Sequence, residues 1–306
     1  MYKSILTVLC CCVQYLYACD FCGGAASVMN NDMLSLQPQS SIGVNTNYKG
    51  FKYLNSENNL LRSHLVSTAI TGSYAPKKWV EIKATLPIVW MSNVYANTKD
   101  KVFGLSDMSI LTNFKAISRS PIGTTKKVGH ILIVGFGLEL PTGKNYIPSE
   151  NQLQNIILGS RSVDFLFSAG YSLSYKNWNF ITTAISKVNT KNKDKIRYGH
   201  LYSMQIGTAY TKTFKKLQLL PNVGMKYEMQ QKNLRKNIIQ NFTGSKALFL
   251  QYGADFLIKN WNLGIQLQHP LVQQTANRTI KQTSTYLLKC TYLIKRNKKF
   301  KTNNKI

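Results

Sequence analysis

Apolar residues recur at every second position through most of this chain. The segment VDFLFSAGYSLSY (163–175) places Phe165 and Phe167 on one parity and Ser168 and Ser172 on the other. Because successive side chains of a β-strand point to opposite faces, this period of two predicts a strand with one apolar and one polar face. The same signal continues along the chain, so the expected fold class is all-β.

The alternating segments are long for strands. Most of them run for 9–13 residues, whereas an ordinary globular strand has about five or six. Such lengths match strands that cross a membrane at a tilt. Twelve segments can be placed: 40–48, 64–74, 79–90, 107–116, 130–140, 163–175, 178–188, 200–210, 217–228, 246–258, 261–268 and 282–294.

The connections between these segments alternate in length. Tight turns are expected at YAPKKW, YKNW, IKNW and around TFKK, and the link 117–129 is longer than the others of this class. Long polar links are expected near 49–63, 91–106, 141–162, 189–199, 229–245 and 269–281. Short turns on one side and long loops on the other are the organisation of an outer-membrane barrel.

We therefore predict a transmembrane, antiparallel up-and-down β-barrel of about twelve strands. Closure removes the unpaired strand edges that a hydrocarbon environment does not tolerate. An exported β-sandwich is the alternative, but its strands are usually shorter and its loops do not alternate in length. Aromatic residues near the expected strand ends suit the interfacial girdles of a barrel: Tyr74, Trp79, Trp90, Tyr175, Trp178, Tyr210, Tyr227, Trp261 and Tyr292.

The first residues have the features of a signal peptide. Lys3 supplies a positive charge, residues 5–17 form an apolar run, and the small Ala18 precedes a possible cleavage site. The run is too short for a spanning helix. The expected organisation is a signal peptide at 1–18, an N-terminal periplasmic segment with CxxC at 19–39, an outer-membrane barrel at 40–294 and a basic C-terminal tail at 295–306.

Cysteine spacing gives one short motif, CDFC, at 19–22. In an oxidising compartment Cys19 and Cys22 could form a disulfide, hold a soft metal or, at Cys19, carry a lipid. A single CxxC without a second pair does not define a metal centre, so these two residues are the only metal candidates and no cofactor is expected.

The chain is strongly basic, with 39 Lys and Arg against 12 Asp and Glu and a formal charge of +27. Such an excess is typical of proteins that bind nucleic acid or anionic membranes. The charges are spread through polar spacers such as TKNKDKIR (190–197), and the long links contain no zinc-finger pattern. In a barrel these links would face the outer leaflet. The expected partner is therefore outer-membrane lipid and not nucleic acid, although ordinary solvated loop charge explains the lysines equally well.

A few charged residues fall on the polar parity of their segments. Asp107, Glu139 and Asp164 would point into the lumen, where carboxylates can select solutes. They could equally form lumen-filling salt bridges, because twelve strands make a narrow barrel. The basic lumen candidates for such bridges are Lys83, Lys187 and Lys226.

Catalytic patterns are scarce. The four histidines, His64, His130, His200 and His269, fall at the ends of different segments, without a short Ser/His signature or an HExxH motif. We therefore expect no enzyme, with a barrel lipase or protease as a less favoured alternative.

The stretch GFGLELPTGKN (135–145) superficially resembles a phosphate-binding loop. Counting back from Gly143, the first glycine of that motif falls on Leu138, and Asn145 stands where Ser or Thr is needed. The stretch instead reads as a strand that ends at Pro141, which cannot donate a ladder hydrogen bond.

Several segments in order resemble one family, the outer-membrane β-barrel transporter-like proteins catalogued as phenol meta-degradation pathway proteins, in the branch with an N-terminal CDxCG segment. The similar segments are CDFCGG (19–24), LSDMSILTNFKA (105–116), GFGLELPTGK (135–144), 162–199 and LQLLPNVGMKYE (217–228). The resemblance implies an outer-membrane barrel with a transport or channel role. The chain differs from the branch at Gly24, where a third cysteine is frequent, and in the basic residues that follow its last strand.

These observations together predict a channel or transporter for small solutes in the outer membrane. The alternative is a plugged barrel with a structural or surface-interaction role.

Overall fold

A computed structural model describes residues 38–54, 60–94, 99–119, 128–143, 158–241, 243–275 and 280–294. The expected signal peptide (1–18), the CxxC segment with Cys19 and Cys22, and the tail at 295–306 lie outside the described residues. Within the described ranges the regular structure is entirely β, as the alternation predicts.

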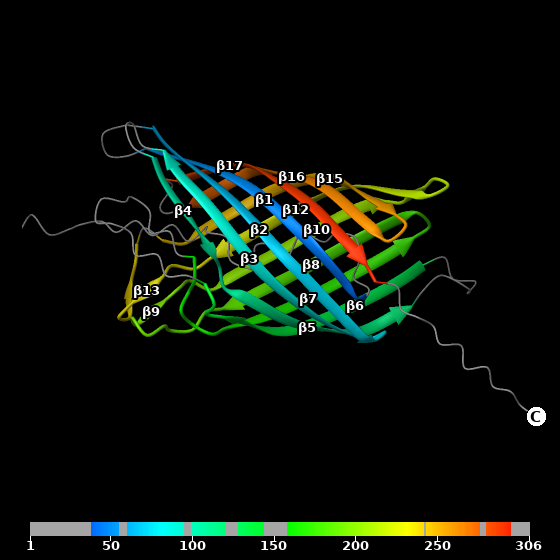
Figure 1. The fold of residues 1–306 in the computed structure, drawn as a ribbon, viewed down its shortest axis with the longest axis horizontal. Coiled ribbons are helices and arrows are strands. Elements are labelled where there is room, and N and C mark those ends of the chain that lie inside the picture. The colour runs from blue at the N-terminus through cyan, green and yellow to red at the C-terminus, as the bar shows by residue number, and fades with distance from the viewer. Residues whose placement is uncertain are drawn as a thin grey trace, which may run out of the picture.

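Long antiparallel strands form a closed barrel wall (Figure 1). Each strand pairs with its neighbours along the chain, and the first and last strands pair with each other, so the barrel is up-and-down and has twelve positions. The wall strands are β1 (Ser41–Leu54), β2 (Leu60–Lys77), β3 (Val80–Val94), β4 (Lys99–Leu105), β5 (Met108–Arg119), β6 (Val128–Leu140), β7 (Asp164–Tyr175), β8 (Trp178–Val188), β10 (Leu201–Tyr210), β12 (Leu217–Gln230), β15 (Ser245–Ile258), β16 (Trp261–Thr275) and β17 (Ile280–Leu293).

Two of these strands share one position in the wall. β4 and β5 both pair with β3, β4 with its second half and β5 with its first half. Ser106 and Asp107 separate them. The predicted strand 107–116 is therefore wrong at its start, because Asp107 lies in a break of the wall and not in the ladder.

Short strands continue from the wall at both ends. β11 (Lys212–Thr213) pairs with β12, and β9 (Ile196–Arg197), β13 (Leu234–Arg235) and β14 (Ile238–Ile239) form a separate sheet at the long-loop end. The sequence prediction treated these last segments as polar links.

Several strands are longer than the alternation predicted. β2 begins at Leu60 and ends at Lys77, and β16 continues to Thr275, where the predicted segments covered 64–74 and 261–268. Ladder pairing continues beyond the alternating segments, since the backbone still needs its hydrogen bonds. In β16 the alternation is interrupted by a bulge, so that Leu271 and Val272 are both exposed. The expected links 49–63, 91–106 and 269–281 are shortened accordingly.

The wall reverses the burial pattern of a soluble protein. On β16 the side chain of Ile265 is 55% exposed, whereas those of Gln266 and Gln268 are 6% and 5% exposed. Along the barrel the outward row is apolar and the inward row is largely polar. Such an outer surface is unfavourable in water and suits lipid, while inward polar groups hydrogen-bond within the lumen. The chain is an outer-membrane type of β-barrel.

Tight turns define the other end of the barrel. The predicted turns YKNW and IKNW are confirmed as two-residue hairpins, with Lys176 and Lys259 at positive φ (52° and 54°). Beside each hairpin a tryptophan packs edge-on against a tyrosine of the adjacent strand: Trp178 against Tyr210 and Trp261 against Tyr292. These pairs form part of an interfacial girdle at the short-turn end.

Candidate functional site

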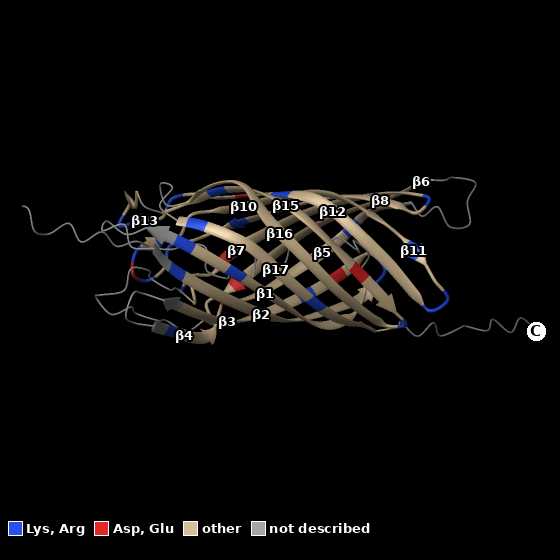
Figure 2. Ribbon diagram, turned by 90° about the horizontal axis from the view of Figure 1, so that it is seen from above, with Lys and Arg blue, Asp and Glu red and all other residues tan. Residues whose placement is uncertain are grey.

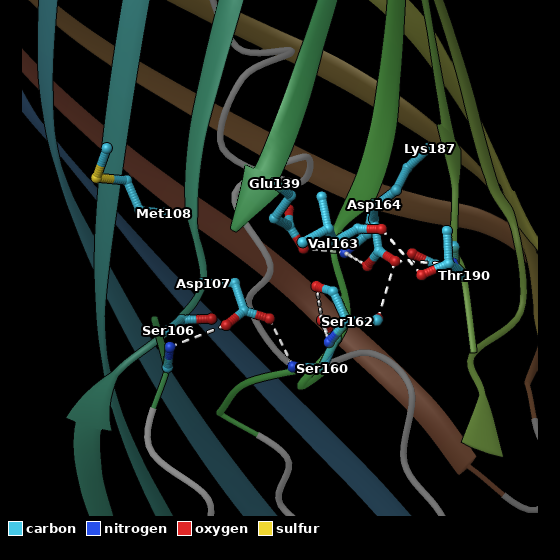
Figure 3. A network of polar contacts seen from close by, with 12 residues as sticks. Ser106, Asp107, Met108, Glu139, Ser160, Ser162, Val163, Asp164, Lys187 and Thr190 are labelled. Atoms are coloured by element: carbon cyan, nitrogen blue, oxygen red, sulfur yellow. Dashed lines mark hydrogen bonds and ion pairs between the residues drawn. The ribbon is translucent and has the colours of Figure 1, made fainter. Parts of the chain in front are cut away.

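A cluster of charged side chains lies inside the barrel at the long-loop end. Its members come from the break after β4, the end of β6, the start of β7 and the end of β8 (Figure 3). We call this group the mouth cluster: Asp107, Glu139, Asp164 and Lys187.

Asp107 anchors the chain on both sides of the longest loop. Its two carboxylate oxygens accept hydrogen bonds from the backbone N–H groups of Gly143 (2.9 Å) and Ser160 (2.5 Å). Gly143 and Gly159 pack closely here, and a Cβ on Gly143 would lie 2.7 Å from the Cα of Gly159. The ELPTG stretch therefore ends β6 and turns its backbone toward a buried carboxylate.

Glu139 and Asp164 face each other across the ladder between β6 and β7. The ammonium group of Lys187 hydrogen-bonds Glu139 and lies 3.6 Å from Asp164 Oδ2. Asp164 also accepts hydrogen bonds through Oδ1 from the Ser162 hydroxyl (2.9 Å) and the Thr190 N–H (2.8 Å). Alternation places these side chains on the inward face. The pairing of β6, β7 and β8 then places them on adjacent strands, close enough for contact.

The mouth cluster holds more acid than base. The cluster has three carboxylates and one lysine, which pairs with Glu139 and Asp164, and both of these carboxylates are fully buried. Among the described residues, Glu139 Oε2 has no hydrogen-bond partner, and the atom is buried. An inward carboxylate favours cations over anions.

The two other lysines that the sequence singled out lie elsewhere. Lys226 on β12 pairs with Glu228 of the same strand (2.7 Å). Lys83 is half-buried on β3, in register with the buried Leu111 of β5, and so faces the lumen. Of the three predicted lysines, only Lys187 contacts the predicted carboxylates.

A further buried ion pair was missed by the sequence prediction. Lys289 Nζ on β17 lies 2.8 Å from Asp255 Oδ1 on β15, with Gly264 of the intervening strand β16 between them. The sequence did contain a signal for this pair, because Lys289 falls on the opposite face of its strand from the apolar Tyr286 and Leu288.

The histidines make pairs that do not resemble a catalytic triad. His64 and His130 bond the hydroxyls of Tyr48 and Tyr171 (2.7 and 2.6 Å), and His269 bonds Ser284 (3.0 Å). None of the four histidines, within the described chain, hydrogen-bonds a carboxylate that could orient it.

His200 lies outside the wall strands, directly before β10. The backbone N–H of Asn189 donates to its Nδ1 (3.0 Å). Partial burial and the nearby Arg197 lower the pKa of this imidazole, while Asp164 opposes the shift. His200 Nδ1 thus acts as a hydrogen-bond acceptor.

The described residues contain no group of three or more His, Cys, Asp or Glu side chains that could hold a metal ion. Cys290 is a free, exposed thiol on β17. The metal candidates Cys19 and Cys22 fall outside the described residues.

The described segments include no helix long and apolar enough to cross a membrane. No protein-family model matches the chain. No match is found among curated proteins.

One solved structure shares the fold, and others are similar to a lesser degree. The COG4313 outer membrane channel from Pseudomonas putida F1 matches with a TM-score of 0.63 and 16% identity, over 86% of this chain and 98% of that one. The β domain of the Bordetella autotransporter BrkA (TM-score 0.46, 9% identity, 83% and 99% covered) and the NanC porin (0.45, 10%, 83% and 100%) match more distantly. At these identities the similarity concerns the fold alone.

Proposed function

We propose that this chain is an outer-membrane channel through which small solutes pass along a polar lumen. The main support for this proposal is the row of polar and charged side chains that face the inside of the closed barrel. A solute that leaves water can exchange its hydrogen bonds for those of Gln, Asn, Ser and ion-paired side chains there. The similarity in fold to an outer membrane channel supports this function.

The mouth cluster would act as the first selective element on this route. Asp107 holds the base of the 141–160 loop, so its main role is to position the backbone. Glu139 and Asp164 are buried, so they would act on the solute through their charge, while Lys187 keeps them from repelling each other. Lys226 and Lys83 would contribute positive charge at other places on the inner wall.

We also propose a family for this chain. The segments CDFCGG (19–24), 105–116, 135–144 and 162–199 support membership in the phenol meta-degradation pathway family of transporter-like barrels, in the CDxCG branch. We assign no catalytic activity, because the histidine pairs lack an orienting carboxylate in the described chain.

A plugged barrel with a structural role is the second candidate. It is favoured by the low exposure of inner-wall side chains such as Gln251 and Glu139, both 0% exposed. Single-channel recording in planar bilayers distinguishes the two functions. A channel gives stepwise openings, and the double variant Glu139→Gln/Asp164→Asn shifts the reversal potential in a KCl gradient toward anions.

The matched control for this recording is Lys176→Gln, which alters an exposed turn at the other end of the barrel. It should leave the reversal potential unchanged. If correctly folded wild-type protein, identified by heat-modifiable migration on gels, shows no openings over a wide voltage range, the channel proposal is refuted and the plugged barrel is supported.

A further inference from the structure

Three basic residues face outward in one row across neighbouring strands. Lys281 of β17 is the direct register partner of Lys52 of β1, and Lys52 is the direct partner of Arg62 of β2. All three are exposed, while their chain neighbours Phe51, Ser63 and Gln282 are buried toward the lumen. Three positive charges therefore lie side by side on the outer surface.

The row continues to both sides. Lys246 of β15 is exposed and pairs with Gln274 of β16, next to β17. Lys101 of β4 is exposed beyond β2 and β3, level with His64 and therefore two residues away from the register of Arg62. Figure 2 shows basic positions gathered at the long-loop end of the β1, β2 and β17 face. We call these five residues the basic arc: Lys246, Lys281, Lys52, Arg62 and Lys101.

This arrangement is unfavourable on its own. Like charges directly opposite each other across a ladder destabilise a sheet. None of the five arc residues forms an ion pair with a carboxylate among the described residues. An external anion would relieve the repulsion.

The basic arc occupies only one side of the barrel. At the same end of β6, β7, β8, β10 and β12, the last outward side chains of the wall are apolar or aromatic: Leu140, Phe165, Val188, Tyr202 and Met229. Basic residues on that side of the same end, such as Lys191, Lys195 and Lys236, lie in the links beyond the wall strands. The arc is therefore a localised feature of the wall and not a consequence of the +27 charge alone.

An aromatic row fixes the depth of the arc relative to the membrane. Tyr48 contacts Tyr286 and His64 on the two adjacent strands, with ring centroids 6.2 and 5.9 Å apart. Aromatic rings of this kind lie at headgroup depth in outer-membrane barrels. Lys52 follows Tyr48 by four residues, or about 13 Å along the strand, on the side away from the hydrocarbon. The arc thus lies at or just beyond the level of the lipid headgroups.

We propose that the basic arc binds the phosphate-bearing headgroup of an anionic membrane lipid. Arg62 can hold phosphate oxygens through two parallel hydrogen bonds, and the flanking lysines contribute charge from both sides. The polar Gln274 and the aromatic row allow the headgroup to sit against the wall with its acyl chains beside Tyr48 and Tyr286. This site is on the lipid-facing surface and is independent of what passes through the lumen.

The test measures lipid binding by folded protein in a neutral detergent. The melting temperature is followed while short-chain phosphatidic acid, phosphatidylcholine or inorganic phosphate is added. Wild-type protein should be stabilised by phosphatidic acid well below the concentration at which the other two act. In the triple variant Lys52→Gln/Arg62→Gln/Lys281→Gln, the half-maximal phosphatidic acid concentration should rise on the order of 100-fold.

A second readout separates binding from damage to the fold. In neutral detergent alone the triple variant should melt at least as high as wild type, because the repulsion within the row is removed. The matched control, Lys215→Gln/Lys216→Gln/Lys259→Gln, removes three exposed lysines at the short-turn end and should keep wild-type lipid affinity.

Three results would overturn the proposal. Equal loss of affinity in both triple variants would mean that only net charge matters. Equal stabilisation by phosphatidic acid and phosphatidylcholine would remove the need for an anion. Stabilisation by inorganic phosphate at the same concentration as phosphatidic acid would identify a free anion, and not a lipid, as the ligand.

Discussion

The ion pair between Asp255 and Lys289 crosses a whole strand, and this geometry depends on a glycine. Asp255 and Lys289 lie on β15 and β17, and Gly264 of β16 is the register partner of both. A Cβ at Gly264 would lie 2.6 Å from Asp255 Oδ1 and 3.1 Å from Lys289 Cε. The absence of a side chain at this point lets the two charges meet above the backbone. We predict that Lys289→Met strongly destabilises the barrel.

The magnitude follows from burial. The side chains of Lys289 and Asp255 are 4% and 9% exposed. Removing one partner of a buried ion pair leaves an uncompensated charge and typically costs about 3–5 kcal/mol. Asp255 Oδ2 still accepts a hydrogen bond from Asn222 Nδ2 (3.3 Å), so we expect the lower end, about 3 kcal/mol. The double variant Asp255→Asn/Lys289→Met removes both charges and should recover most of this loss.

Urea unfolding in detergent, followed by tryptophan fluorescence, gives the free energies for a double-mutant cycle. Gly264→Ala should weaken the same ion pair sterically, so its effect should be largely lost in the Lys289→Met background. A Lys289→Met cost below about 0.5 kcal/mol, as at ordinary surface sites, or strictly additive effects in the double variant, would refute the reasoning.

Three further predictions concern the loop anchor, His200 and the lipid-facing wall. Asp107→Ala removes the acceptor of two backbone N–H groups, and should speed hydrogen exchange at Gly143 and Ser160 by at least tenfold in mass spectrometry of exchanged peptides, while Asp107→Asn has a smaller effect. The lowered pKa of His200 means that the unfolded chain takes up a proton before the folded one; the contribution of this residue is therefore complete above pH about 6.5 and declines as the pH falls. His200→Gln should flatten the dependence of the urea midpoint on pH between 7 and 5, and an unchanged slope would contradict the assignment. Ile265→Arg places a charge on the lipid face about 13 Å from Trp261 along the strand, and should cost about 2–4 kcal/mol in refolding equilibria in lipid vesicles; full tolerance would mean that this face does not contact hydrocarbon.

Much of the barrel was predictable because its wall obeys one rule at every position. Alternation identified the outward and inward faces, and turn residues such as Lys176-Asn177 marked the hairpins. The rule is interrupted in the extension of β16, where a bulge leaves Leu271 and Val272 both exposed. The strand β4 does alternate, with Val102 buried and Phe103 exposed, but it is only 7 residues long and was missed.

The site was less predictable than the fold. Parity placed Glu139, Asp164 and Lys187 on the inward face, but contact between them depends on the register of β6, β7 and β8, which a single sequence does not specify. The role of Asp107 depends on a bond to the backbone more than fifty residues away, at Ser160. The Asp255–Lys289 pair requires three strands to be aligned at once.

The inverted wall also bears on how such a chain reaches its membrane. Lipid-facing residues commonly alternate with polar or small inward neighbours, as Ile265 does with Gly264 and Gln266, and an uninterrupted apolar run such as 131–138 in β6 is far shorter than the roughly 20 residues of a membrane-spanning helix. A translocation channel that diverts hydrophobic helices sideways into the inner membrane would find nothing in these strands to divert. The apolar belt comes into existence only when the strands pair and all alternate residues turn the same way. In this protein the apolar surface therefore forms only on folding, which can take place after the chain has crossed the inner membrane.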